Sequence, residues 1–596
     1  MCRIAGQVSL RTNADEMCRR VAAMTLAMQH GGPDGEGQFL DDKNSICFGH
    51  RRLALIDLSA DANQPMTDVS GNYTITFNGE IYNYQSIKKK LQHIGYQFKN
   101  QSDTEVILTA YAHWGTAAFD HFNGMFAFAL FDKRQQKVYL VRDQSGMKPL
   151  YYQLKNRELV FASEIRAFRK IGISQENQDW KILFLAFGFV PEPATVLDQV
   201  WMLPKGSFLE WNIAAETYDI QNYIQVKTAS KITSLEEAKH LLKQQFGQAV
   251  QRHLIADAPV GLFLSGGIDS SIVALEASKL KGSGLHTLSL TFDDVAYDES
   301  KYQLMIADKI DSQHHQLHIS QKNFDEDFVT ILQAMDQPTA DGVNTWFVSN
   351  LAKKHGIKAV LSGLGGDELF GGYPSFKRIK ILQRLEKALP DFALKSFQKL
   401  PVKAYQKLAY LSLHSAVGYY LSLRGYFTPV QIANILNIPV KEVWQKIKNH
   451  TYRPDLESDS SLLAAQLEQD LYMQNQLLRD ADNMSMQHGI EIRLPFLDTE
   501  FIRTVNNIHP SIRFDQKLQK GLLIKSYQNL LPEEIWNRSK MGFSFPLQKW
   551  LKNSLITTKM KKSKNASIAS FTDDFLKDKL HWSKLLALYF VNSTNQ

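Results

Sequence analysis

The chain has 596 residues, of which 44% are hydrophobic and 22% are charged, a composition typical of a globular protein with at least two domains. Its net charge of +7 is modest for this length and, without a concentrated basic face, argues against a nucleic-acid partner while suiting anionic small molecules. No apolar run approaches the roughly 18 residues of a membrane span, and the start lacks a signal peptide's apolar core, so we expect a cytoplasmic protein with no membrane partner.

The chain begins Met1-Cys2-Arg3, and removal of Met1 leaves a thiol and a free α-amine on one residue. An α-amine has a pKa of about 8, close enough to neutrality to act as a general base toward its own side chain. Cys2 is therefore a candidate nucleophile, against the alternative of an ordinary residue near a chain end. Cys18 and Cys47 show no metal-ligand spacing, so we expect neither a disulfide nor a zinc framework.

Short apolar runs alternate with polar turns through the first 190 residues and predict strands of stacked sheets. The expected strands are 46–50, 73–77, 125–131, 138–141 and 158–162. The second of them runs into Asn78 and Gly79, whose side-chain amide and N–H can donate to a developing oxyanion. Arg52 can pair with a substrate carboxylate and Asp103 with a substrate ammonium. Together these side chains predict a pocket for a free amino acid.

Several segments of this half resemble the glutamine-hydrolysing half of glutamine-dependent asparagine synthetases, namely Cys2, 30–35, 78–83, 123–128 and 142–152. The resemblance implies an α+β N-terminal-nucleophile sandwich (αββα) over residues 1–190, which hydrolyses glutamine to glutamate and ammonia through Cys2. The residues that it assigns to glutamine binding are Arg52, Asn78, Glu80 and Asp103, and those that it assigns to the oxyanion hole are Asn78 and Gly79.

Two residues depart from the family's pattern. Arg3 replaces the first glycine of the family's commoner MCGIAG motif, and Gly31 replaces the arginine of its HRGPD motif. Since one lies beside the proposed nucleophile and the other in a loop, we expect them to affect reaction rate or loop closure while the polar constellation stays intact.

A proline-rich stretch follows, with Pro191-Glu192-Pro193 and then Leu203-Pro204-Lys205-Gly206. Such a composition is typical of a connector, so residues 191–239 are expected to link two domains. Leucines and alanines at helical spacing then predict a helix over 234–255.

The strongest motif of the chain is Phe263-Leu264-Ser265-Gly266-Gly267-Ile268-Asp269-Ser270-Ser271, between an apolar run at 259–262 and a helical run at 272–277. A strand, a glycine turn and a helix start form an anion site, because the first N–H groups of a helix lack intrahelical partners. The three hydroxyls add donors, and the carboxylate can hold Mg²⁺ on the same phosphates. We therefore expect a site for the pyrophosphate of ATP; the alternative is a simple tight turn. The pattern is neither a Walker loop nor a nucleophile elbow.

Apolar and helical runs then alternate at 285–292, 302–310, 316–319, 345–355 and 358–361, which predicts a parallel sheet. The last of these runs leads into Ser362-Gly363-Leu364-Gly365-Gly366-Asp367-Glu368. Ligands bind at the carboxyl ends of parallel strands, so we expect this second glycine-rich loop to close over the same nucleotide.

Both loops resemble those of the same synthetase family, whose ATP-pyrophosphatase domain is similar to residues 240–596. The resemblance assigns Asp269 and Asp367 to Mg²⁺. It assigns ATP binding to Leu264, Ser265, Gly266, Gly267, Asp269, Ser270, Ser271, Ser362, Gly363 and Lys540. Lys540 falls at the family's phosphate-contacting lysine, although a single lysine is commonly a solvated surface charge.

The resemblance implies that ATP activates an acceptor carboxylate as an acyl-adenylate, which ammonia made at Cys2 converts to an amide. The partners are then glutamine, ATP and a carboxylate, with a homodimer as a further possibility. Leu364 stands where the family usually has a glutamate, so the acceptor is open: aspartate is the first reading and a sugar uronic acid of surface-polysaccharide biosynthesis the second, with Glu368 as a substitute base. A glutaminase-only or nucleotide-binding relic is a third reading, against which the intact loops and Cys2 argue.

Overall fold

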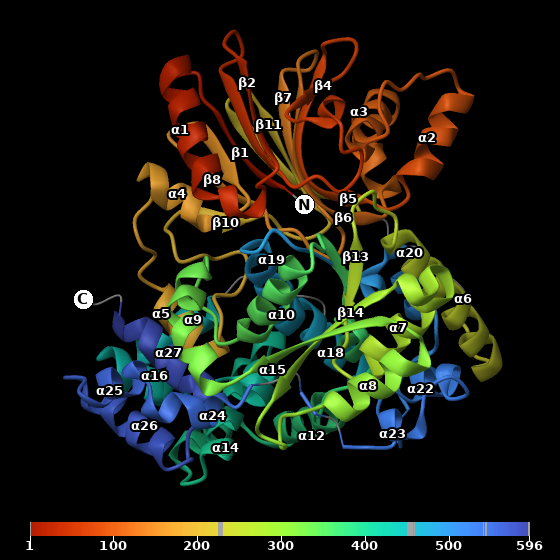
Figure 1. Ribbon diagram of the computed structural model, residues 1–596. Coiled ribbons are helices and arrows are strands. Elements are labelled where there is room, and N and C mark those ends of the chain that lie inside the picture. The colour runs from red at the N-terminus through yellow and green to blue at the C-terminus, as the bar shows by residue number, and fades with distance from the viewer. Residues whose placement is uncertain are drawn as a thin grey trace.

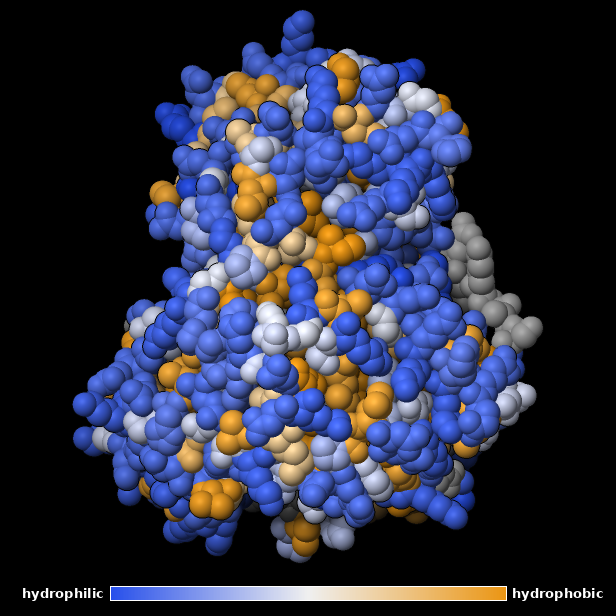
Figure 2. All heavy atoms as spheres, turned by 45° about the vertical axis from the view of Figure 1, so that its right-hand side comes forward, coloured by the Kyte–Doolittle hydropathy of each residue, from blue (hydrophilic) through white to orange (hydrophobic). Residues whose placement is uncertain are grey.

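The computed structural model describes residues 2–224, 231–449, 457, 459–515, 517–539, 541–542 and 545–593. Two units lie one above the other in Figure 1, an N-terminal unit of strands in red to yellow and a larger C-terminal unit in green to blue. Figure 2 shows that hydrophilic residues cover most of one face, while hydrophobic side chains gather along the middle of that face where the two units meet.

Two six-stranded antiparallel sheets build the N-terminal unit, as expected from the alternating apolar runs. The first has the order β10-β8-β9-β1-β3-β2 and the second the order β12-β11-β7-β6-β5-β4. The first sheet contains β1 (Arg3–Val8), β2 (Gly35–Asp41), β3 (Ile46–Arg52), β8 (Tyr151–Lys155), β9 (Glu158–Ala162) and β10 (Val200–Met202). The second contains β4 (Met66–Thr67), β5 (Tyr73–Ile81), β6 (Gly124–Asp132), β7 (Lys137–Arg142), β11 (Ser207–Asn212) and β12 (Thr217–Asn222).

Helices cover the outer faces of both sheets. Helix α1 (Ala14–Ala27) packs on β1 and β3 of the first sheet and on α4 (Ile165–Ile171), while α3 (Asp103–Trp114), beside α2 (Tyr84–His93), packs on β5 of the second. Buried side chains of both sheets, among them Phe48 and Phe131, form the layer between them. This confirms the αββα sandwich.

The segment expected to be a connector contributes to both units. Its strand β10 pairs with β8, β11 pairs with β7, and β12 pairs with β11, so the N-terminal sheets extend through Asn222, beyond the expected boundary at residue 190. The prolines do not break these strands because they lie in the turns before them. Ahead of this segment, α5 (Trp180–Phe187) leaves the sandwich and packs against four helices of the C-terminal unit, α15 (Ala416–Arg424), α16 (Pro429–Leu436), α17 (Val440–Lys448) and α27 (Trp582–Ser593).

The C-terminal unit is built on a five-stranded parallel sheet of order β15-β14-β13-β16-β17, which confirms the predicted parallel sheet. Its strands are β13 (Val260–Phe263), β14 (His286–Phe292), β15 (Gln313–Ile319), β16 (Ala359–Leu361) and β17 (Glu491–Arg493). From β13 the chain adds β14 and then β15 on one side of the sheet. It then crosses to the other side of β13, where it adds β16 and β17. Ligands bind at such a switch point, outside the carboxyl ends of the strands.

Helices surround this sheet and extend it into a large helical region. Those nearest the sheet are α6 (Leu235–His253), α7 (Ile268–Lys281), α8 (Ser300–Lys309), α9 (Gln321–Ala334), α10 (Val343–Lys354), α11 (Gly366–Phe370), α19 (Leu478–Met486), α20 (Thr499–Asn506) and α22 (Gly521–Tyr527). The others are α12 (Ser375–Ala388), α13 (Asp391–Ser396), α14 (Lys403–Gln406), α15 (Ala416–Arg424), α16 (Pro429–Leu436), α17 (Val440–Lys448), α18 (Ser460–Leu467), α21 (Pro510–Arg513), α23 (Glu533–Trp536), α24 (Leu547–Trp550), α25 (Leu555–Lys561), α26 (Ala566–Leu576) and α27 (Trp582–Ser593). None of the helices within the described ranges is long and apolar enough to span a bilayer.

Candidate active sites

Cys2 lies directly before β1, at the end of the sandwich that faces the C-terminal unit, and is 8% exposed. Its backbone nitrogen donates to Asn78 Oδ1 at 3.1 Å, and its Sγ lies 3.9 Å from the carbonyl oxygen of Leu53. Burial raises the pKa of the Cys2 thiol above its usual value. The resting thiol is therefore protonated at neutral pH, and its use as a nucleophile requires a base.

The predicted oxyanion donors lie on β5, next to Cys2. Asn78 is fully buried, and its Nδ2 has no hydrogen-bond partner within the described part of the chain. Gly79 has a φ of +150°, and a Cβ there would collide with the carbonyl oxygen of Met125 on β6. A buried amide donor without a partner is costly, so it is suited to bind an oxygen of a ligand.

Arg52, Glu80 and Asp103 are three of the residues predicted to bind glutamine. Arg52 Nη1 donates to Ser59 O at 2.8 Å and its Nη2 to Asp57 O at 2.5 Å, so in this structure the guanidinium orders the loop after β3. Asp103 begins α3 and accepts from the backbone N–H of the residue after Glu80 at 2.9 Å. Burial raises the pKa of Asp103 to about 7 and that of Glu80 well above its usual value, so a cation placed beside them would favour their charged forms.

The two departures from the family pattern are neighbours in space. Arg3 is fully buried, with Nε 2.5 Å from Glu164 Oε1 and Nη1 3.0 Å from Asp482 Oδ2 on α19 of the C-terminal unit. A Cβ at Gly31 would lie 2.8 Å from Arg3 Cγ. Gly31 therefore leaves the space that the Arg3 side chain fills.

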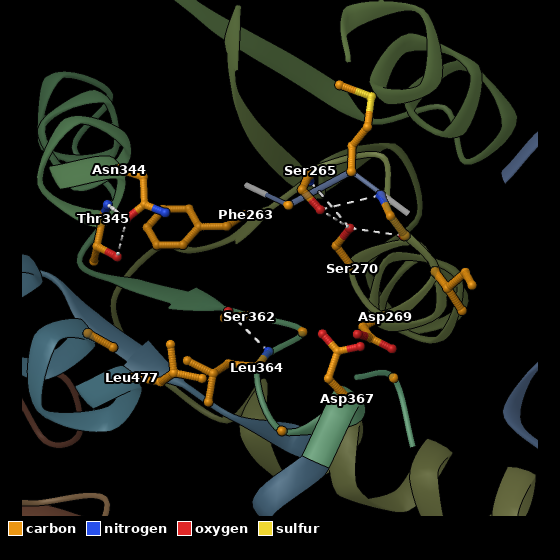
Figure 3. Close-up of a pocket in the computed structure, with 18 of the residues that line it drawn as sticks. Phe263, Ser265, Asp269, Ser270, Asn344, Thr345, Ser362, Leu364, Asp367 and Leu477 are labelled. Carbon is orange, nitrogen blue, oxygen red and sulfur yellow. Dashed lines mark hydrogen bonds between the residues drawn. The ribbon is translucent and has the colours of Figure 1, made fainter. Parts of the chain in front are cut away.

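A cavity of about 640 Å³ opens at the carboxyl ends of β13 and β16 (Figure 3). Both glycine-rich loops line it, as the switch-point rule predicts. The predicted nucleotide-binding residues that line it are Leu264, Ser265, Gly267, Asp269, Ser270, Ser362 and Gly363, together with Asp367. Gly266 and Ser271 are outside this lining, and Lys540 lies outside the described residues.

The first loop is held in place by its own serines and by Arg538. Ser265 Oγ and Ser270 Oγ are 2.9 Å apart, and the N–H of Gly267, the N-cap of α7, points at Ser265 Oγ at 3.3 Å. Arg538 Nη2 donates to Gly266 O at 3.0 Å and to Glu299 Oε1 at 2.6 Å. The start of a 14-residue helix and two hydroxyls thus face the cavity, an arrangement suited to an anionic group.

The two loops approach each other so closely that side chains are excluded between them. A Cβ at Gly366 would lie 2.5 Å from Asp269 Oδ1, and a Cβ at Gly363 would lie 2.7 Å from the backbone nitrogen of Ser270. Figure 3 shows the consequence, with the carboxylates of Asp269 and Asp367 side by side at the cavity wall.

Lys520 was not among the predicted site residues, but its side chain contacts both of these carboxylates. Its Nζ lies 2.5 Å from Asp269 Oδ2 and 2.5 Å from Asp367 Oδ1, and the side chain is 6% exposed. Burial lowers the pKa of Lys520, but the two carboxylates raise it more, so the net pKa is above its usual value. In the sequence Lys520 is one lysine among many, and only the fold brings it to the two loops.

The positions of Asp269 and Asp367 also show whether Mg²⁺ would fit at this wall of the cavity. Asp269 and Asp367 converge on one cationic atom, and Mg²⁺ in nucleotide sites is commonly held by one or two carboxylates together with substrate phosphates. No set of three or more His, Cys, Asp or Glu side chains among the described residues is placed to hold a metal. The pair therefore fits an ion that ATP helps to bind, and such an ion would neutralise phosphate charge.

On the opposite wall, Leu364 faces Leu477 and forms an apolar surface (Figure 3). Glu368 also lines the cavity and accepts a hydrogen bond from the hydroxyl of Tyr373 at 2.6 Å. Burial first, and then Asp367, raise the pKa of Glu368 to about 7. A carboxyl group with this pKa can exchange a proton near neutral pH.

Comparisons with known proteins agree with this geometry. A family model described as asparagine synthase matches residues 241–584, and one described as a glutamine amidotransferase domain matches residues 1–224. The chain is 32% identical to asparagine synthetase [glutamine-hydrolyzing] 1 of Bacillus subtilis over 90% of this chain and 85% of that protein. It is 34% identical to putative asparagine synthetase [glutamine-hydrolyzing] 2 of Methanocaldococcus jannaschii (68% and 81% covered) and 26% identical to amidase chry2 of Gibberella zeae (91% and 87% covered).

Proposed function

The chain belongs to the glutamine-hydrolysing asparagine synthase family of ATP-dependent carbon–nitrogen ligases, and from this premise we propose that it transfers the amide nitrogen of glutamine to the carboxylate of aspartate. One observation carries the proposal. A buried Cys2 beside the Asn78 amide and a cavity between two glycine-rich loops occur in the two units of one chain. Neither site alone completes the reaction, because the first supplies ammonia and the second activates a carboxylate.

In the N-terminal unit, Cys2 Sγ attacks the amide carbon of glutamine while the α-amine of the same residue takes the thiol proton. This base is needed because burial keeps the thiol protonated. Asn78 Nδ2 and the Gly79 N–H donate to the oxyanion, and Asp103 and Glu80 accept the α-ammonium of glutamine. Ammonia leaves, and water then releases glutamate from the thioester.

In the C-terminal unit, the acceptor carboxylate attacks the α-phosphorus of ATP and pyrophosphate leaves. The serines of the first loop, the start of α7 and Lys520 bind the pyrophosphate. Asp269 and Asp367 would hold Mg²⁺, which would neutralise phosphate charge. Ammonia attacks the acyl carbon of the adenylate, and AMP leaves. Glu368 takes the proton that the attacking ammonia loses, because it lines the cavity and titrates near neutral pH.

The acceptor is inferred from the names of relatives and from the wall of the cavity. The name of the 32% identical relative favours aspartate. Leu364 is the observation that favours a second candidate, a sugar uronic acid, because an apolar side chain stands where the family usually has a glutamate and forms an apolar wall with Leu477. A relative named as an amidase is also consistent with a family that accepts more than one substrate.

Two measurements test the proposal. In Cys2→Ala, glutamine-dependent amide formation is expected to disappear while added ammonia still supports it; loss of both would make Cys2 only a structural residue. Pyrophosphate release with a panel of carboxylates then identifies the acceptor. If aspartate yields neither pyrophosphate nor asparagine while a uronic acid yields both pyrophosphate and an amide, aspartate is excluded.

A further inference from the structure

Strand β17 separates the two sites. It has only three residues, and neighbouring side chains of a strand point to opposite faces. Ile492, the middle residue, lines the nucleotide cavity. Glu491 and Arg493, on either side of it, face the N-terminal unit, where Arg493 Nη2 lies 3.7 Å from Glu80 Oε1. One short strand thus forms part of the wall of both sites.

Arg493 is fully buried, and most of its guanidinium is fixed. Nε lies 2.5 Å from Glu491 Oε1, while Nη1 donates to the carbonyl oxygens of His253 at 2.8 Å and Ile255 at 2.6 Å. Only Nη2 points toward Glu80, and it lacks a hydrogen-bond partner among the residues that the structure describes. The same holds for Glu80 Oε2. The 3.7 Å between Arg493 Nη2 and Glu80 Oε1 therefore allows electrostatic attraction but is too long for a hydrogen bond.

The backbone of Arg493 reaches the other site. Its carbonyl oxygen accepts the N–H of Ser362 at 2.9 Å, and Arg493 pairs with Leu361 in the parallel ladder. Ser362 is the first residue of the second loop and lines the nucleotide cavity. A single residue therefore touches a glutamine-site carboxylate with its side chain and the nucleotide loop with its backbone.

We propose that Arg493 couples the two sites, so that glutamine binding changes the affinity for ATP, and ATP binding changes the affinity for glutamine by the same factor. The inference rests on the proposed function, in which Glu80 binds the α-ammonium of glutamine. That ammonium is a second cation beside Glu80, so it changes the attraction between Glu80 and Arg493 Nη2. The rest of the guanidinium is anchored to backbone and to Glu491, so the change acts on β17 and thereby on Ser362. Reciprocity follows because the coupling is a single free energy.

The test uses Cys2→Ala, which binds glutamine without hydrolysing it. We expect the Kd of ATP, measured by titration calorimetry, to differ at least about fivefold with and without saturating glutamine. The Kd of glutamine should shift by the same factor with ATP. Adding Arg493→Lys shortens the reach to Glu80 and removes the forked contacts, so both ratios should fall to about one.

Arg166→Lys in the same background is the matched control. Arg166 also joins the two units, through Glu164 and Asp336, but contacts neither Glu80 nor the second loop, so its variant should keep the ratio. Glu491→Gln is the milder second variant, expected to lower the ratio if Arg493→Lys does not fold. A ratio of one in Cys2→Ala itself, or an unchanged ratio in a folded Arg493→Lys, overturns the coupling while glutamine-dependent synthesis stands. Failure of glutamine to bind Cys2→Ala at all instead overturns the glutamine site.

Discussion

Replacing Lys520 with methionine removes the cation shared by Asp269 and Asp367 while keeping a side chain of similar length. Both carboxylates are largely buried, with 15% and 19% of their side chains exposed, and each lies 2.5 Å from Lys520 Nζ. The change leaves two like charges facing each other at the junction of the two loops.

The expected cost is that of breaking a buried ion pair by removing one partner, about 3–5 kcal/mol of unfolding free energy. Lys525→Met is the matched control, because Lys525 Nζ lies 2.6 Å from Asp515 Oδ2 but the lysine side chain is 39% exposed. A pair of this kind contributes about 0–1 kcal/mol. The two variants remove the same group from the same helix region and differ mainly in burial.

Denaturant unfolding of wild type and both variants measures this difference, with and without Mg²⁺. We expect Mg²⁺ to restore part of the stability of Lys520→Met, since the ion supplies the missing positive charge, and to change the wild type little. Equal midpoints for Lys520→Met and Lys525→Met would refute the reasoning about the buried triad. Absence of any Mg²⁺ effect on Lys520→Met would argue against the carboxylate pair as a metal site.

Three further predictions concern single residues. Gly372→Ala drives a Cβ into Asp367 and should lower pyrophosphate release about 100-fold, as measured at saturating ATP. Amide formation at fixed free ammonia should rise with pH through about 7, as Glu368 loses its proton, and Glu368→Gln should lose that step. Gly31→Ala should lower the free energy of unfolding, measured with denaturant, by about 1–3 kcal/mol, because the Arg3 side chain occupies the space that the new Cβ needs. In an Arg3→Ala background the same change should cost much less, and additive costs of the two changes would contradict this.

Local sequence patterns predicted most of the fold because the apolar periodicity and the glycine turns are strong signals. The run before Ser265 became β13, and the loop after β16 met it at the cavity, as parallel topology requires. The connector was harder to predict: the prolines near 191 and 204 indicate turns, but strand pairing with β7 and β8 is a long-range property. Local composition does not determine which distant strand pairs with a strand at the edge of a sheet.

The site shows the same limit. Cys2 and Asn78 were predicted from their chemistry, and the structure places them in contact. Lys520 carries no local signal of a role, since it acts on residues more than 100 positions away in the chain. Arg52 was predicted to pair with a substrate carboxylate. The sequence did not indicate that its terminal nitrogens also bond the loop after β3, as a buried guanidinium binds the backbone carbonyls around it.

The central claim is that nitrogen released at Cys2 reaches a carboxylate activated by ATP in the same chain. The most direct measurement supplies glutamine labelled with ¹⁵N in its side-chain amide, together with ATP, aspartate and unlabelled ammonium in solution. We expect the label in the product amide, with one pyrophosphate and one glutamate formed per product. Glutamate formation without pyrophosphate from any tested carboxylate, or a product amide that carries only unlabelled nitrogen, would contradict the account.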